Sequence, residues 1–142
     1  MSKEKSIQII AALVLVVSIA ATRWFASSTQ KDGELLVEMV AEDSRFKPAE
    51  IRVQAGTRVI LKVRAMDDKH GIAFKLIAEG KPEGSPAGLR FNQPVPDWVL
   101  EQGKETTIEF VAVLPGRYEF ACSVFCGMGH NQMLGRVIVA PR

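Results

Sequence analysis

The chain has 142 residues, 47% of them hydrophobic, and a formal net charge of +2. This length favours a single domain, and the apolar content is typical of a globular protein. Four of the 18 basic and two of the 16 acidic residues lie before Gly33, which leaves 14 of each sign in the rest of the chain. That part is neutral and has no Lys/Arg run, which argues against nucleic acid as a partner.

The N-terminal segment is apolar from residue 7 to residue 22, with only three polar interruptions. Its length is close to the lower limit of about 17 residues for a membrane span. Trp24 and Phe25 follow it, where aromatic residues meet the membrane interface. We predict a single-pass membrane protein with residues 1–32 as anchor and linker and residues 33–142 as a periplasmic or otherwise extracytoplasmic domain. A cleaved signal peptide is the alternative.

The rest of the chain shows the period-two alternation of half-buried strands. For example, Val59, Leu61 and Val63 share one strand face. By this pattern we expect strands at residues 35–40, 51–53, 58–64, 72–77, 106–112, 117–122 and 134–139. Short strands with frequent turns predict a mainly β fold, an antiparallel sandwich or a Greek-key barrel. Residues 78–104, which hold four of the seven prolines, are predicted to form a long irregular excursion.

Soft metal ligands are concentrated near the C-terminus, where twelve residues contain Cys122, Cys126, His130 and Met133. The chain has no other cysteine, and its only other histidine is His70. Thiolate and thioether groups select copper, and imidazole suits it, so the segment is predicted to bind metal with His70 as a further ligand. A disulfide would close only a small loop and would leave His130 and Met133 unexplained.

Three kinds of metal site are compatible with these residues. Zinc would accept both cysteines and both histidines in a tetrahedral site. A mononuclear blue-copper site would use His70, Cys126, His130 and Met133, which leaves Cys122 without a role. A binuclear copper site would use every candidate, with two bridging thiolates, one histidine on each metal, one methionine and one main-chain carbonyl.

The run Cys-Ser-x-x-Cys-Gly-x-x-His-x-x-Met at residues 122–133 resembles the CuA loop of cytochrome c oxidase subunit II. Residues 46–56 and the stretch leading to His70 are similar to the cupredoxin strands that carry this family's first histidine. The single apolar N-terminal segment looks like the subunit II of B-type haem-copper oxidases. The resemblance covers residues 46–77 and 116–139.

This resemblance implies a cupredoxin-like sandwich that holds two copper ions. The resemblance implies that Cys122 and Cys126 provide two bridging thiolates and that His70 and His130 provide two terminal imidazoles. It also implies a weak thioether ligand from Met133 and a backbone carbonyl ligand from Val124. The family usually has Glu or Gln where Val124 stands, so a magnesium site that uses this Glu is not expected. The family's aromatic cluster for electron entry has only Trp98, Tyr118 and Phe125 as candidates here.

The implied function is electron transfer from a periplasmic donor such as cytochrome c to subunit I of a haem-copper oxidase. No Ser/His/Asp set, phosphate-binding glycine loop or catalytic carboxylate pair is recognisable, so enzymatic activity of the chain itself is left open. The main alternative is a membrane-anchored periplasmic copper carrier or assembly protein. A zinc-stabilised binding module is the other.

Overall fold

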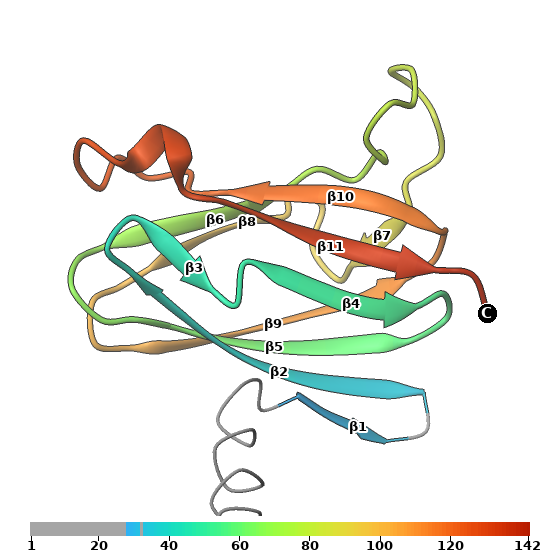
Figure 1. Cartoon of the computed structure of the whole chain (residues 1–142), viewed down its shortest axis with the longest axis horizontal. Helices are drawn as coiled ribbons and strands as arrows, with labels where there is room; N and C mark the ends of the chain where they lie inside the picture. The colour runs from blue at the N-terminus through green and yellow to red at the C-terminus, as the bar shows by residue number, and fades with distance from the viewer. Residues whose placement is uncertain (1–27, 32) are drawn as a thin grey trace, which may run out of the picture.

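The computed structural model describes residues 28–31 and 33–142. In these residues the chain forms two β-sheets packed face to face and one short 3-10 helix, η1 (His130–Gln132) (Figure 1). The predicted membrane-spanning segment, residues 7–22, lies outside the described residues. Within the described part, no helix has both the length and the apolar character needed to cross a bilayer.

The first sheet has the strand order β1-β2-β5-β9-β7, and β3 pairs with β2 off this path. Its strands are β1 (Ser28–Lys31), β2 (Glu34–Glu42), β3 (Arg45–Lys47), β5 (Arg58–Ala65), β7 (Leu89–Phe91) and β9 (Glu105–Ala112). β1 pairs antiparallel with β2, so the sheet begins upstream of residue 33.

The second sheet has the order β4-β11-β10-β6-β8. Its strands are β4 (Glu50–Gln54), β6 (His70–Phe74), β8 (Asp97–Leu100), β10 (Gly116–Ala121) and β11 (Leu134–Ala140). β10 and β11 form an antiparallel hairpin, and β6 lies on the other side of β10. The chain leaving β10, the chain entering β11 and the start of β6 therefore meet at one end of this sheet.

The predicted alternation of buried and exposed residues is confirmed along the long strands. Val59, Leu61 and Val63 have no exposed surface, and Arg58 and Arg64 face solvent. Complete burial of one apolar side chain of this kind contributes about 1.5–3 kcal/mol. The inward-facing side chains of both sheets form one continuous core, which holds the two sheets together.

Two strand pairings are parallel, which departs from the antiparallel sandwich, one of the two folds that we expected beside a Greek-key barrel. β2 pairs in parallel with β5, and β4 pairs in parallel with β11. The chain passes from the first sheet to the second between β3 and β4 and returns to the first between β4 and β5. β5 consequently enters beside β2 in the same direction. A strand with one buried face has the same alternation in either orientation, so the pattern does not distinguish them.

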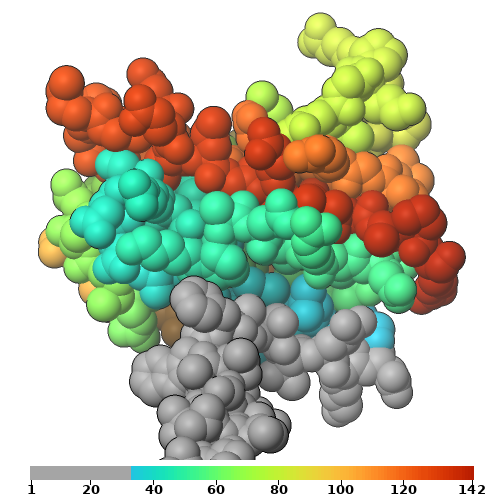
Figure 2. Space-filling view, viewed as in Figure 1, coloured from blue at the N-terminus to red at the C-terminus, as the bar shows by residue number. Residues whose placement is uncertain are grey.

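The excursion at residues 78–104 contains two short strands that were not predicted. β7 pairs with β9, and β8 pairs with β6. Trp98 in β8 packs against Phe74 and Phe91, with ring centroids 6.0 and 5.4 Å away. Strands of three and four residues are too short to show a clear period in a proline-rich segment. The segment between β6 and β7 protrudes at the opposite end from residues 122–133 (Figure 1 and Figure 2).

Candidate metal centre

The loop between β10 and β11 is closed at its base by backbone hydrogen bonds. Ala121 and Leu134 are the last paired residues of the hairpin, and the next N–H, of Cys122, donates to the carbonyl of Met133 at 3.0 Å. The N–H of Met133 donates to the carbonyl of His130 at 3.1 Å. The loop therefore returns its potential ligands to the end of the sandwich from which it starts.

His70 is the first residue of β6, whereas the sequence pattern had placed it in the preceding loop. β6 runs antiparallel to β10, with Ala73 opposite Ala121, so the start of β6 lies beside the chain that leaves β10. The N–H of Gly71 donates to the Cys122 sulfur at 3.5 Å. A side chain at Gly71 would overlap Ser123, so glycine is required for this close approach.

The two ring nitrogens of His70 have different surroundings. Nε2 lies 2.8 Å from Oδ1 of Asp67, and the hydrogen bond from His70 lowers the pKa of this carboxyl group. An ionised Asp67 accepts a hydrogen bond from Nε2–H, which assigns the ring proton to Nε2 and the lone pair to Nδ1. Nδ1 is buried and has no hydrogen-bond partner among the described residues. His70 is 1% exposed, and a buried ring nitrogen that accepts no hydrogen bond is the arrangement expected of a metal ligand.

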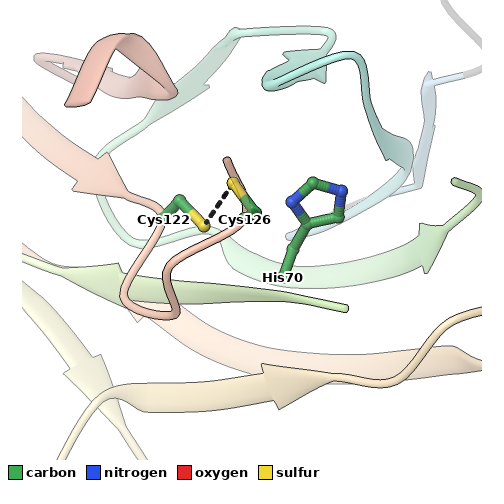
Figure 3. Close-up of side chains that lie close together, drawn as sticks. All are labelled: His70, Cys122 and Cys126. Atoms are coloured by element: carbon green, nitrogen blue, oxygen red, sulfur yellow. Dashed lines mark hydrogen bonds between the residues drawn. The ribbon is translucent and has the colours of Figure 1, made fainter. Parts of the chain in front are cut away.

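The two cysteines bring their sulfurs together beside this histidine (Figure 3). The sulfurs of Cys122 and Cys126 are 3.6 Å apart, well beyond the 2.05 Å of a disulfide, and both thiols are free. The potential ligand atoms of His70, Cys122 and Cys126 all lie within 4.8 Å of one another. This separation leaves space for a metal to be shared by three donor atoms.

The remaining predicted residues lie around the same sulfurs. The Cys126 sulfur is 3.9 Å from Nδ1 of His130 and 3.9 Å from the thioether sulfur of Met133. The carbonyl oxygen of Val124 is 3.0 Å from the Cys122 sulfur. All six residues predicted from the sequence are thus gathered at one end of the sandwich, and their assignment as ligands stays a prediction.

Burial controls the protonation of the Cys126 sulfur. It raises the pKa of the Cys126 thiol to about 11, and the neighbouring Cys122 thiol adds to the rise. Cys126 is therefore a neutral thiol at pH 7 when no metal is bound. A metal ion must displace this proton to bind the sulfur as thiolate. The donor set of two thiols, a thioether and imidazoles fits copper in its chemistry.

The predicted aromatic candidates for electron entry differ in position. Trp98 is partly buried against the core, beside Phe74, and Tyr118 is buried with its hydroxyl directed to the carbonyl of Leu114. Phe125 is 76% exposed, and its ring centroid lies 5.7 Å from that of His130. Of the three candidates, Phe125 is the one that joins a potential ligand to the surface.

Residues 15–139 match the cupredoxin-like domain family. The chain belongs to this family. Cytochrome c oxidase subunit 2 of Thermus thermophilus is 26% identical to it over 94 residues, which cover 66% of this chain and 57% of that protein. A second subunit 2 from T. thermophilus has the same identity, with 46% of its length covered. The cupredoxin-like chain thus spans about half the length of these curated relatives. The resemblance to subunit II is confirmed.

Solved structures share the cupredoxin-like fold. Auracyanin A, a blue copper protein from Chloroflexus aurantiacus, has a TM-score of 0.57 at 17% identity, with 76% of this chain and 100% of that chain covered. A chain of a haem-copper terminal oxidase dimer has a TM-score of 0.55 at 20% identity, with 97% of this chain and 100% of that chain covered. Likeness at these identities establishes the fold, and the predicted mainly β cupredoxin-like sandwich is confirmed.

Proposed function

We propose that this cupredoxin-like domain binds two copper ions in a CuA centre and transfers single electrons. In this proposal it accepts them from a donor such as cytochrome c and passes them to subunit I of a haem-copper oxidase. The observation that carries the proposal is the pair of free sulfurs 3.6 Å apart, with other soft donors around them. A mononuclear site needs only one thiolate, so a second thiol in the same cluster favours two ions.

Each residue has a role in this proposal. Cys122 and Cys126 would hold both ions through their thiolates, His70 and His130 would each hold one ion, and the Met133 thioether and the Val124 carbonyl would be the weak ligands. The bound copper pair supplies a one-electron redox couple. Met133 has no exposed surface, and His70 is nearly as buried, so the protein excludes water from one side of the centre. Strands β6, β10 and β11 fix the positions of the ligands, which limits their movement during electron transfer.

Residues 7–22 complete the proposal as a membrane anchor. Residues 1–32 serve as anchor and linker, with β1 as the part of the linker that joins the first sheet, and residues 33–142 serve as the extracytoplasmic copper domain. An anchor of this kind keeps the domain close to a membrane-embedded oxidase, which raises the effective concentration of each partner for the other. The apolar composition of residues 7–22 supports this proposal.

Metal content and electron paramagnetic resonance of the copper-loaded full chain in detergent test the proposal. We expect two coppers per chain, with one unpaired electron split by both nuclei, and one electron accepted from reduced cytochrome c for each pair. One copper with a mononuclear signal would contradict a binuclear centre. Silent copper that a chelator removes readily would instead identify a copper carrier.

Substitution of the thioether distinguishes copper from zinc. A Cys₂His₂ zinc site would bind its metal equally well in Met133→Leu, whereas a copper site that uses the thioether would change its spectrum. Met128→Leu is the matched control, because Met128 lies in the same loop but is 99% exposed. We expect a changed spectrum in Met133→Leu and an unchanged one in Met128→Leu.

A further inference from the structure

We propose that the two-residue turn formed by Asp43 and Ser44, between β2 and β3, helps to position the metal ligands, in addition to β6 and the β10–β11 loop that carry them. In this proposal Ser44 supports the ligand loop at Gly129, and the backbone of Asp43 holds the carboxylate that orients His70. The proposal rests on the proposed copper centre for the identity of the ion. The turn belongs to the first sheet, whereas the ligands lie on the second.

The backbone of this turn is strained. Asp43 and Ser44 have φ angles of 52° and 54°, and neither is a glycine. A two-residue hairpin with positive φ at both positions is a type I′ turn, for which Asn-Gly is preferred and serine is unfavourable. Such strain persists where surrounding contacts require the residue, and it is concentrated at functional sites. The strain at Ser44 therefore indicates that its contacts hold it in this conformation.

Ser44 lies directly against the ligand loop. A Cβ atom added to Gly129 would be 2.5 Å from the Cβ of Ser44 and 2.6 Å from its hydroxyl oxygen. Gly129 has φ −86° and ψ 0°, which any residue can adopt, so the close approach is the reason for glycine here. In Figure 2 the segment containing this turn lies immediately beneath the loop before β11. The residue after Gly129 is the potential ligand His130.

The other residue of the turn reaches the first histidine through Asp67. The N–H of Asp43 donates to Oδ2 of Asp67 at 2.8 Å, and Oδ1 of the same carboxylate lies 2.8 Å from Nε2 of His70. Because the Asp43 donor is a backbone group, its direction depends on the turn conformation. One turn is thus connected to potential ligands on both β6 and the β10–β11 loop.

Three serine variants test whether Ser44 positions the ligand loop or only completes a turn. Ser44→Gly removes the hydroxyl and relieves the strain, Ser44→Ala removes the hydroxyl and keeps the strain, and Ser85→Ala removes a distant hydroxyl that donates to Pro82 O. We expect Ser44→Gly to unfold at or above the wild-type temperature without metal, and Ser44→Ala below it. With copper bound, Ser44→Gly should have an altered visible spectrum and a shifted reduction potential, because it removes both the Cβ and the hydroxyl that lie against Gly129, and Ser44→Ala, which keeps the Cβ, should change less. The expected shift is up to about tenfold in the one-electron equilibrium constant, or about 59 mV.

A copper spectrum and potential of Ser44→Gly that match wild type and Ser85→Ala would overturn the proposal for Ser44. The stoichiometry of the wild type is measured in the same samples. If the wild type binds one copper, the binuclear centre is wrong, and the comparison of variants at that single copper still decides the role of Ser44.

A second measurement needs no metal. We expect the Asp43 amide of the metal-free protein to exchange its hydrogen at least tenfold faster in Asp67→Ala than in Asp68→Ala. Asp68 is the matched control because its carboxylate accepts from the Lys69 N–H. Equal exchange rates in the two variants would overturn the connection from the turn to His70.

Discussion

Tyr118 and His70 are two polar side chains buried to the same extent, each 1% exposed, and their surroundings differ. The Tyr118 hydroxyl donates to the carbonyl of Leu114 at 2.8 Å, so its hydrogen-bonding need is met within the protein. His70 satisfies Nε2 through Asp67 but leaves Nδ1 without a partner in the described part of the chain. A buried polar group that is satisfied supports the fold, whereas a buried acceptor that is unsatisfied marks a position for a ligand.

The packing around the two side chains shows the same contrast. A side chain at Gly88 would overlap the Tyr118 hydroxyl, so the backbone closes over this group. At the other end, Gly71 also permits close approach, but there the neighbours are Ser123 and a sulfur that accepts its N–H. One end of β10 is closed by the protein alone, and the other collects donor atoms that a metal can complete.

Replacement of His70 gives the largest expected effect. In His70→Leu we expect loss of copper binding with little change in metal-free stability, within about 1 kcal/mol, because the variant loses one hydrogen bond but also removes an unsatisfied buried acceptor. Urea unfolding of the metal-free protein and copper analysis measure the two effects. Full retention of copper in this variant would show that the unsatisfied nitrogen is not a ligand.

Replacement of Asp67 should weaken metal binding without abolishing it. Removal of a group that orients a ligating histidine commonly costs about 10–100-fold in metal affinity. We expect a loss of this size in Asp67→Ala and none in Asp68→Ala, as measured by competition with a chelator. Equal affinities in the two variants would mean that His70 keeps its orientation without the carboxylate.

The pH dependence of copper binding follows from the raised pKa of Cys126. Because this thiol has a pKa of about 11, binding at pH 7 releases its proton, and affinity should rise about tenfold per pH unit for each proton released. Competition titrations between about pH 6 and pH 8 measure the slope. In the metal-free protein, a pKa raised above the unfolded value contributes stability that is present below pH 9.0 and lost as pH rises towards about 11. An affinity independent of pH would contradict this protonation state.

The sequence was most informative where one physical pattern extends over many residues. The strand that contains Val59, Leu61 and Val63 was predicted because its alternation lasts through the seven residues 58–64. The observed strand, β5, spans Arg58–Ala65. The pairing of His70 with the cysteine loop was predicted from ligand chemistry, since the two are far apart in sequence. The structure places them together, and their binding of metal stays a prediction.

Other features of the fold and the site had no signal in the sequence or an ambiguous one. β3 and β7 are three residues long, which is too short for a period to be recognised. The contact between Ser44 and Gly129 depends on a turn of one sheet that reaches a loop of the other, so no spacing along the chain indicates it. Asp67 could be recognised as a possible partner of His70, but an acidic pair in a turn is equally typical of a solvated cap.

The smallest expected effect concerns Tyr118. Tyr118→Phe removes one satisfied hydrogen bond and should lower the free energy of unfolding by about 1 kcal/mol. The copper spectrum and affinity should be unchanged, because the hydroxyl is directed away from the ligand loop to Leu114. Burial also raises the pKa of Tyr118, so its neutral form contributes stability that is present below its unfolded pKa of 10.0 and lost as pH rises beyond it. The variant should lack this alkaline loss, which urea unfolding at neutral and alkaline pH measures. A change in the copper spectrum would show instead that the two ends of β10 are coupled.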